Sequence, residues 1–339
     1  MNQIAITTHP NIALIKYWGK RNEQLFLPTK SSLSIGLDAL STKTTISLSS
    51  FGHDIITING VPAEERHAQP VLDFLKFFRN NFAHGACPGW SLCVHTTNSF
   101  PTAAGLASSA SGFAALALGL DKFFNLELSG QELSILARQG SGSACRSLFG
   151  GFVLWNRGQE IDGSDSFAAP LYPTQHWPTL RVIIVIVAQE AKKISSRIAM
   201  KNSIATSPIY NKWVQDSEQR LVLMCQAIEH KNFDLVGQLA EEDCLGMHAT
   251  MHTSTPAVNF WSPVTHNIMQ LVTILRTKHN IACYFTIDAG PNIKILCQEA
   301  DVQKILLHIN TTPGVECIVS GVAGAPKSES DELCGVARI

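Results

Sequence analysis

A run of small residues, PTAAGLASSAS at positions 101–111, has the composition of a phosphate-binding site. Small side chains let a phosphate approach the main chain, and a helix that starts here directs its N–H groups and positive dipole end towards the anion. Ser108 and Ser109 add hydroxyls that can bind phosphate or Mg²⁺. The run matches neither the P-loop motif nor GxGxxG, which disfavours P-loop NTPases and dinucleotide-binding folds. A tightly packed helix N-cap remains the alternative interpretation.

Two further segments combine hydroxyl groups with cations. GSGSACRS at 140–147 places Arg146 beside several serines, and a guanidinium pairs bidentately with a carboxylate or phosphate. AKKISSRIAM at 191–200 places cations around two serines: Lys192, Lys193 and Arg197 around Ser195 and Ser196. Such a set suits a multiply charged phosphate, although a turn with a surface arginine and a solvated helix face explain the two segments equally well.

Two other segments contain residue types suited to catalysis. NIALIKYWGK at 11–20 gathers lysines and aromatic residues after an apolar run, a pattern that an edge strand with protective lysines also shows. DAGPN at 288–292 places one carboxylate at a turn between two apolar strands. A carboxylate in that position can orient a hydroxyl or accept its proton during phosphoryl transfer, although most such aspartates only brace their turn.

Composition narrows the class of protein. The 339 residues carry 26 Lys+Arg against 27 Asp+Glu, a net charge of −1, so we expect no nucleic-acid or membrane partner and a local pocket for any anionic ligand. The 9 cysteines form no CxxC pair, which favours free thiols in a reducing compartment. With no predicted targeting or membrane-spanning segment, the sequence predicts a soluble cytoplasmic protein.

The first half of the chain is predicted to combine strands of a mixed or antiparallel sheet with one buried helix. Residues 44–50, 54–58 and 91–98 read as strands, and Asn59-Gly60 favours a hairpin turn. Residues 105–124 are rich in Ala and Leu and predict a buried helix that starts after a glycine-containing turn. Residues 140–147 are predicted as a second such turn before a strand in GGFVLWN.

The second half is predicted to be α+β. The β-branched run 181–188 indicates a strand buried on both faces, and it follows a loop-like stretch over 161–178, so a domain boundary near residue 180 is expected. Residues 209–230 have helical periodicity, and Ser262-Pro263 is a typical helix start. YFTIDAGPNIKILC predicts strand, tight turn and strand.

Taken together, these motifs resemble the mevalonate diphosphate decarboxylases, members of the GHMP kinase superfamily. The resemblance rests on NIALIKYWGKR, LPTKSSLSIGL, PTAAGLASSAS, RQGSGSACRSLFGGFVLW, KKISSRIAM, MHATMHTSTP and YFTIDAGPNIKIL, which follow the family order over residues 11–297. It implies a two-domain GHMP kinase fold, with a ribosomal-S5-like N-terminal domain (1–182) that binds ATP and a ferredoxin-like C-terminal domain (183–339). The active site is expected in the cleft between them.

The resemblance also implies a reaction. ATP phosphorylates the 3-hydroxyl of mevalonate 5-diphosphate, and phosphate and CO₂ then leave to give isopentenyl diphosphate, with Mg²⁺ as cofactor. Family members are commonly homodimers, so a homodimer is expected. The alternatives are a related kinase or decarboxylase that acts on mevalonate or its monophosphate, and a nucleotide-binding protein of the same fold that has lost catalysis.

Site residues follow from the motifs that match. The resemblance implies catalytic roles for Asp288 at the tertiary hydroxyl, Arg146 at the substrate carboxylate and Asn11 in the network around them. It assigns substrate binding, chiefly of the diphosphate, to Tyr17, Lys20, Ser141, Gly142, Ser143, Ser196, Arg197 and Ala289. It assigns ATP binding to Pro101, Ala104, Gly105, Leu106, Ala107, Ser108, Ser109 and Lys192, with Ser108 as a candidate Mg²⁺ ligand.

One position departs from the family pattern. In LPTKSSLS, Lys30 stands where the family usually has asparagine. The sequence leaves two interpretations open: an additional cation near the site, or an altered loop.

Overall fold

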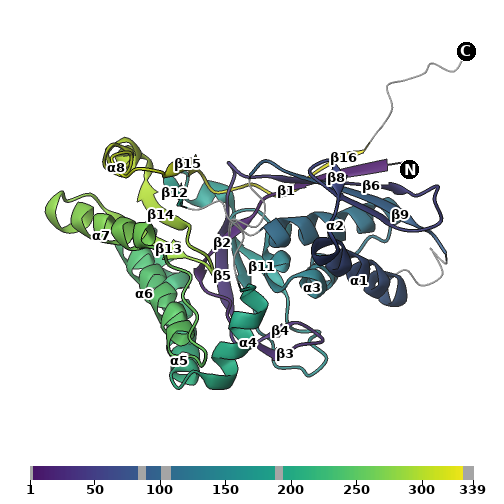
Figure 1. Ribbon diagram of the computed structural model, residues 1–339, viewed down its shortest axis with the longest axis horizontal. Helices are drawn as coiled ribbons and strands as arrows, with labels where there is room; N and C mark the ends of the chain where they lie inside the picture. Colours follow the sequence, from purple (N-terminus) through teal and green to yellow (C-terminus); the bar gives the residue numbers. More distant parts are fainter. Residues whose placement is uncertain (1–2, 83–88, 101–107, 188–193, 331–339) are drawn as a thin grey trace, which may run out of the picture.

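The computed structural model describes residues 3–82, 89–100, 108–187 and 194–330. Figure 1 shows two parts lying side by side, with the N-terminal strands and helices α1 to α3 in one and helices α5 to α8 in the other. No described helix is both long enough and apolar enough to cross a bilayer. The candidate residues at 101, 104–107 and 192 lie outside the described residues.

The first sheet has six strands in the order β16-β1-β6-β9-β7-β8. All neighbours are antiparallel except β7 and β9, so of the two predicted arrangements, mixed or antiparallel, the sheet is mixed. Asn59 and Gly60 both have positive φ and form the expected tight hairpin turn. The strand bounds are β1 (Gln3–Thr8), β6 (Thr42–Leu48), β7 (Ile55–Ile58), β8 (Val61–Pro62), β9 (Leu92–Asn98) and β16 (Lys327–Ser330).

Three helices lie on one side of this sheet (Figure 1): α2 (Ser108–Phe124) packs on β1 and β6, α1 (Glu65–Asn81) contacts β7, and α3 (Gly130–Gly140) packs on α1 and α2. The predicted buried helix is confirmed as α2, because Phe113, Leu116 and Leu120 pack with Ile6 and Ile46 of the sheet. A complete capping box between Ser129 and Glu132 starts α3.

A second sheet, β11-β10-β5-β2, is antiparallel throughout. Its strands are β2 (Asn11–Ile15), β5 (Ser32–Gly36), β10 (Phe152–Trp155) and β11 (Ala168–Tyr172), and β3 (Lys20–Asn22) pairs with β4 (Leu27–Pro28) beside it. The loop predicted over 161–178 is wrong in part, since it contains β11 and the short 3₁₀ helix η2 (Thr174–His176). Pro170 is tolerated in β11 because that strand lies at the sheet edge.

The turn predicted over 140–147 is also wrong. Gly140 is the last residue of α3, and a 3₁₀ helix, η1 (Gly142–Leu148), follows directly. A side chain at Gly140 would overlap the ring of Phe113, and one at Gly142 would overlap the phenol of Tyr17. The glycines are therefore needed for close packing rather than for an open turn.

The third sheet, β13-β14-β12-β15, lies in the second half of the chain. Its strands are β12 (Leu180–Ile186), β13 (Cys283–Ile287), β14 (Ile293–Gln298) and β15 (Glu316–Ser320). The helices of this half are α4 (Ser196–Thr206), α5 (Tyr210–Glu229), α6 (Phe233–His252), α7 (Pro263–Lys278) and α8 (Val302–Ile309), with the short η3 (Glu299–Asp301) before α8.

The prediction that residues 181–188 form a strand buried on both faces is confirmed for residues 181–186, which lie in β12, whereas Val187 follows the strand. Val182 and Ile184 pack in a core that includes Ile12 and Leu14 of β2. Ile183 and its neighbour Val185 face the opposite way, towards α7 and α8. One hydrophobic core therefore joins β2 to the second half of the chain and fixes the position of the residues that follow β2.

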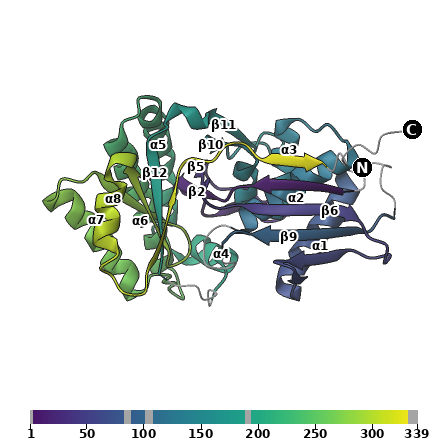
Figure 2. The same cartoon turned by 90° about the horizontal axis from the view of Figure 1, so that it is seen from above.

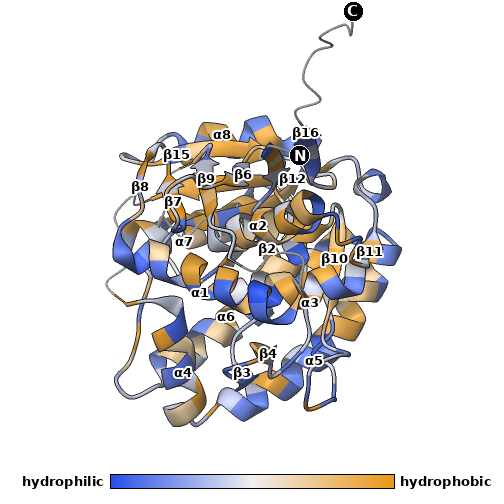
Figure 3. Cartoon of the chain, turned by 90° about the vertical axis from the view of Figure 1, so that its right-hand side faces the viewer, coloured by the Kyte–Doolittle hydropathy of each residue, from blue (hydrophilic) through white to orange (hydrophobic). Residues whose placement is uncertain are grey.

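Both halves contain helices and sheets, so the predicted α+β class is confirmed. The last described strand, β16, pairs with β1, which brings the end of the chain back to the first sheet (Figure 2). Helices such as α1 and α5 contain both hydrophobic and hydrophilic residues, interspersed along their length (Figure 3), as is typical of helices with one buried face.

Candidate active site

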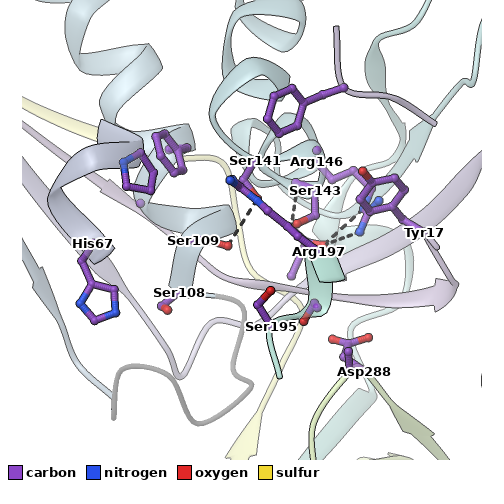
Figure 4. A pocket seen from close by; sticks show the side chains of 18 of the residues that line it. Tyr17, His67, Ser108, Ser109, Ser141, Ser143, Arg146, Ser195, Arg197 and Asp288 are labelled. Atoms are coloured by element: carbon purple, nitrogen blue, oxygen red, sulfur yellow. Dashed lines mark hydrogen bonds between the residues drawn. The ribbon is translucent and has the colours of Figure 1, made fainter. Parts of the chain in front are cut away.

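A cavity of about 670 Å³ brings the predicted residues together. Its walls come from the segment around β2, from η1, from the starts of α2 and α4, and from the turn between β13 and β14. Figure 4 shows the labelled side chains arranged around it. Every described candidate lines this cavity: Asn11, Tyr17, Lys20, Ser108, Ser109, Ser141, Gly142, Ser143, Arg146, Ser196, Arg197, Asp288 and Ala289.

Asp288 lies in the turn after β13 and is paired with a buried lysine. Lys16 Nζ donates a 2.8 Å hydrogen bond to Asp288 Oδ1, and the lysine side chain is only 1% exposed. Burial alone would raise the pKa of Asp288, but the positive charges of Lys16, Lys294 and Arg146 outweigh it and lower that pKa. Asp288 is therefore an ionised carboxylate that can accept a hydrogen bond from an alcohol.

Arg146 is a buried cation held by neutral side chains. Its guanidinium donates to Asn11 Oδ1 at 3.2 Å and 3.3 Å and to the hydroxyls of Ser32 at 2.7 Å and Ser34 at 3.0 Å. Asn11 in turn donates to Ser147 Oγ at 2.7 Å. No described carboxylate forms an ion pair with Arg146, whose direct hydrogen-bond partners are all neutral, and the charge of Asp288 acts on it only at longer range. This arrangement suits the carboxylate or phosphate of a ligand.

Tyr17 and Lys20 lie on another wall of the cavity. The Tyr17 hydroxyl is buried with no hydrogen-bond partner among the described residues, and burial raises its pKa, so it stays a neutral donor. Lys20 Nζ lies 3.0 Å from Glu23 Oε2 and 4.1 Å above the ring of Phe26. A cavity lined by an unpartnered buried hydroxyl and by an ammonium group is a fitting place for an anionic oxygen.

The start of α4 adds positive potential to the same wall. Ser195 is its N-cap and accepts from Ile198 N, and Ser196 begins the helix. Arg197 donates to Gly140 O at 3.1 Å and lies over Phe26, 5.5 Å from the ring centroid. A helix N-terminus together with a guanidinium favours a phosphate group here.

The opposite end of the cavity lies at the start of α2. Ser108 and Ser109 open that helix, and Ser109 Oγ lies 3.3 Å from Ser141 Oγ. Figure 4 shows both α2 serines on the far side of the cavity from Asp288. One cavity thus joins two regions rich in hydrogen-bond donors, at the starts of α2 and α4, with the carboxylate of Asp288 and the guanidinium of Arg146 on its walls.

Sequence reasoning missed several residues of this cavity. Lys16 was one of a cluster of lysines with no role of its own, although its place directly after the buried run NIALI marks it as a buried cation. The wall made by α1, β7 and β9 was also missed, where apolar side chains such as Ile56 and Val94 lie near Arg66 and His67. No motif pointed to these residues, because they come together only through the fold.

Comparison with known proteins agrees with the geometry. The profile of the diphosphomevalonate decarboxylase-like N-terminal domain matches residues 8–168, and that of the mevalonate 5-diphosphate decarboxylase C-terminal domain matches 182–331. The rat diphosphomevalonate decarboxylase is 39% identical over 351 residues, covering 97% of this chain and 86% of the rat protein.

Solved structures are similar over the same length. The mevalonate diphosphate decarboxylase of Staphylococcus aureus superposes with a TM-score of 0.89 at 35% identity, covering 97% of this chain and 98% of that one. The complex of MDDEF with MVAPP, AMPPCP and magnesium gives a TM-score of 0.88 at 38% identity, covering 97% and 99%. The chain belongs to the diphosphomevalonate decarboxylase family.

Proposed function

We propose that this chain catalyses the ATP-dependent decarboxylation of mevalonate 5-diphosphate to isopentenyl diphosphate, CO₂, ADP and phosphate. The observation that carries the proposal is the ionised Asp288, held by Lys16 at 2.8 Å, in the same cavity as the buried cation Arg146, which forms no ion pair with a described carboxylate. The reaction needs both groups: one for the hydroxyl that is phosphorylated and one for the carboxylate that is lost. The related complex with MVAPP, AMPPCP and magnesium supports the same ligands for this chain.

In this proposal, the substrate carboxylate binds Arg146, which Asn11, Ser32 and Ser34 hold in place. The diphosphate binds at the wall with the unpartnered Tyr17 hydroxyl. Its negative charge is met by Lys20, Ser196 and Arg197, while Ser141, Gly142, Ser143 and Ala289 complete the substrate region of the cavity. The tertiary hydroxyl then lies beside Asp288.

ATP binds at the start of α2, where Ser108 and Ser109 offer hydroxyls at a helix N-terminus. The other proposed ATP residues, Pro101, Ala104, Gly105, Leu106, Ala107 and Lys192, lie outside the described residues.

Mg²⁺ fits this site through few protein ligands. The described residues contain no cluster of three or more His, Cys, Asp or Glu side chains able to hold a metal. Mg²⁺ commonly binds phosphate oxygens and water with only one or two protein ligands, so the Ser108 hydroxyl suffices as a protein ligand. When bound, the ion neutralises phosphate charge during transfer.

The proposed chemistry has two stages. Asp288 orients the 3-hydroxyl and accepts its proton as the oxygen takes the γ-phosphoryl group from ATP, while the surrounding cations stabilise the transferred charge. The C–O bond to the new phosphate then breaks, and the electron pair of the C–CO₂⁻ bond forms the double bond as CO₂ leaves. Arg146 and Asn11 hold the carboxylate in position until that bond breaks.

The finer structural assignments belong to the same proposal. We assign residues 1–182 to a ribosomal-S5-like domain and 183–339 to a ferredoxin-like domain, supported by the positions of the two matched profiles. A homodimer in the cytoplasm is also proposed. The free thiols of the described cysteines support a reducing compartment.

The test compares mevalonate, its 5-monophosphate and its 5-diphosphate as substrates with Mg-ATP, with organic products identified by mass spectrometry. We expect isopentenyl diphosphate from the diphosphate, with kcat/KM at least 100-fold above that of the other two. A phosphorylated acid that accumulates in place of the alkene identifies a kinase instead, and a preference for the monophosphate overturns the proposed substrate.

A further inference from the structure

Two carboxylates outside the cavity each accept a hydrogen bond from a backbone N–H next to the end of a strand. Asp243 of α6 is fully buried, and its Oδ2 accepts a 2.6 Å hydrogen bond from the backbone N–H of Lys16. Glu218 of α5 accepts a 2.7 Å bond from the backbone N–H of Ser31 through Oε1. Lys16 directly follows β2 and Ser31 directly precedes β5, and these two strands are paired neighbours.

Ladder pairing does not reach these two backbone positions. The register of β2 with β5 shifts between Ala13 and Ile15, and the last pair on this side is Ile15 with Leu33. Carboxylates from two helices therefore bind N–H groups just beyond the ladder. In a buried place such groups need a partner, because an unpaired buried N–H is costly.

Two cations accompany the carboxylates. Lys30 is 1% exposed, with Nζ bonded to Ser31 O at 3.2 Å and lying 4.9 Å from the centre of the Trp213 ring. Arg220 Nη1 lies 3.6 Å from Asp243 Oδ1, and neither atom has a hydrogen-bond partner in the part of the chain that the structure describes. Lys30, Glu218, Arg220 and Asp243, the charge cluster, thus combine two positive with two negative side chains. This also answers the question left by the sequence: Lys30 is a buried member of a charge cluster.

The carboxylates of the charge cluster bind the two backbone segments that carry the partners of Asp288 and of Arg146. Lys16, whose backbone Asp243 holds, carries the ammonium group that binds Asp288. The strand β5, whose start Glu218 holds, carries Ser32 and Ser34, the hydroxyls that accept from Arg146. None of the four members of the charge cluster lines the cavity.

We propose that Asp243 is a positioning residue, which, with Glu218, Lys30 and Arg220, holds Lys16 in the geometry that binds Asp288. The inference rests on the proposed function, because it assigns a task to Lys16 and Asp288 in that reaction. A displacement of about 1 Å in a group at the reaction centre lowers turnover by roughly 100-fold. The positions of residues outside the cavity therefore bear directly on kcat.

The pH dependence of kcat distinguishes a positioning role of Asp243 from a general contribution to the stability of the fold. Activity requires ionised Asp288, so it falls as the pH drops through the pKa of that carboxyl, which Lys16 helps to lower. If Lys16 moves away, that pKa rises, and the acidic limb of the kcat profile moves to higher pH. Other titratable or charged groups also face Asp288: Arg146 in η1, Lys294 in β14, and Cys244 and His248 in α6. Burial is the main cause that raises the pKa of the Cys244 thiol, so this thiol stays neutral at acidic pH with or without the charge of Asp243, and burial lowers the imidazole pKa of His248 to about 3.

The experiment compares Asp243→Ala, Asp243→Asn and the control Glu242→Gln with the wild type by CO₂ release from mevalonate 5-diphosphate. Glu242 is the neighbour on α6, is 61% exposed and contacts Arg220 at 3.4 Å. We expect a 10- to 100-fold lower kcat for Asp243→Ala, an acidic limb at higher pH and an ATP dissociation constant within about twofold of the wild type. Asp243→Asn keeps an oxygen acceptor and is expected to recover much of the activity, and Glu242→Gln all of it.

A double variant tests the charge balance of the charge cluster, and it remains informative if Asp243→Ala does not fold. Asp243→Asn alone leaves Lys30 and Arg220 with Glu218 as the one carboxylate of the charge cluster, whereas the pair Asp243→Asn with Lys30→Met removes one charge of each sign. We therefore expect a higher kcat for the double variant than for Asp243→Asn alone. A folded Asp243→Ala variant with wild-type kcat and acidic limb overturns the proposal, as does an equal loss of ATP binding with an unmoved limb, or a double variant no more active than Asp243→Asn alone. Absence of CO₂ from the wild type instead overturns the proposed function, so the two failures are distinguishable.

Discussion

Burial of Lys30 makes the stability of the protein depend on alkaline pH in a specific way. The side chain is 1% exposed, and desolvation by burial lowers its pKa from 10.5 to about 8, although the negative charges of Asp243 and Glu218 oppose the decrease. Between these two pH values the unfolded chain binds a proton at Lys30 that the folded chain has lost. Stability from this residue therefore rises with pH across that window.

The size of the effect follows from the two pKa values. One pKa unit corresponds to about 1.4 kcal/mol, so the change from 10.5 to about 8 gives roughly 3 kcal/mol between pH 7 and pH 10.5. Below pH 8 Lys30 is protonated in both states, and its contribution is constant. The perturbation is Lys30→Met, which keeps an unbranched side chain of similar length and removes the titrating group.

The assay is reversible urea unfolding of the wild type and Lys30→Met at intervals from pH 7 to 10.5. Other groups titrate in both proteins, so the quantity of interest is the difference between their unfolding free energies. We expect the wild type to gain about 3 kcal/mol relative to Lys30→Met over this range. The control Lys212→Met removes a lysine on α5 that is 76% exposed and should show no such trend. A difference that stays flat, or that changes in the opposite direction, refutes the reasoning about Lys30.

Three further predictions concern the cavity. Asp288→Asn should lower kcat by about 100- to 10,000-fold with little change in the binding of either substrate, measured by steady-state kinetics and calorimetry; near wild-type turnover removes Asp288 from the mechanism. Arg146→Lys keeps the positive charge but loses the planar guanidinium, so KM for the diphosphate substrate should rise by roughly 10- to 100-fold while ATP binding stays unchanged. Weaker ATP binding with an unchanged KM for the diphosphate substrate would contradict the assignment of Arg146 to the substrate carboxylate. Tyr17→Phe removes a hydroxyl that has no hydrogen-bond partner among the described residues, so the melting temperature of the variant should not fall. Its KM for the diphosphate substrate should rise. A less stable variant with normal KM argues that the hydroxyl has a structural role.

Local sequence patterns predicted the elements whose causes are local. Asn59 and Gly60 form the hairpin turn because their backbone tolerates positive φ, and the capped start at Ser262 begins α7 as expected. The strand β12 followed from its β-branched residues. These features depend on neighbours in the chain, so one sequence is enough to reveal them.

The missed elements depend on distant partners. The strand β16 has the polar sequence KSES, and only pairing with β1, more than 300 residues earlier, makes it a strand. The strand β11 contains Pro170, which reads as loop until its place at a sheet edge is known. Nothing in either segment indicates the partner.

The residues of the candidate site also fall into those that a local motif reveals and those that depend on distant partners. Motif resemblance led to Asp288 and Arg146, and the structure places both in one cavity. Lys16 was missed because its meaning lies in an ion pair with a residue 272 positions away. Lys30 could not be interpreted for the same reason, since its neighbours Glu218 and Asp243 come from helices in the other half of the chain.

The central claim is that a single site couples phosphoryl transfer to decarboxylation. The most direct measurement counts CO₂ released from carboxyl-labelled mevalonate 5-diphosphate and ADP formed from Mg-ATP in the same reaction. We predict one CO₂ for each ADP at every time point after the first turnover. ADP that accumulates without CO₂ would contradict the account and indicate a kinase whose phosphorylated product is stable.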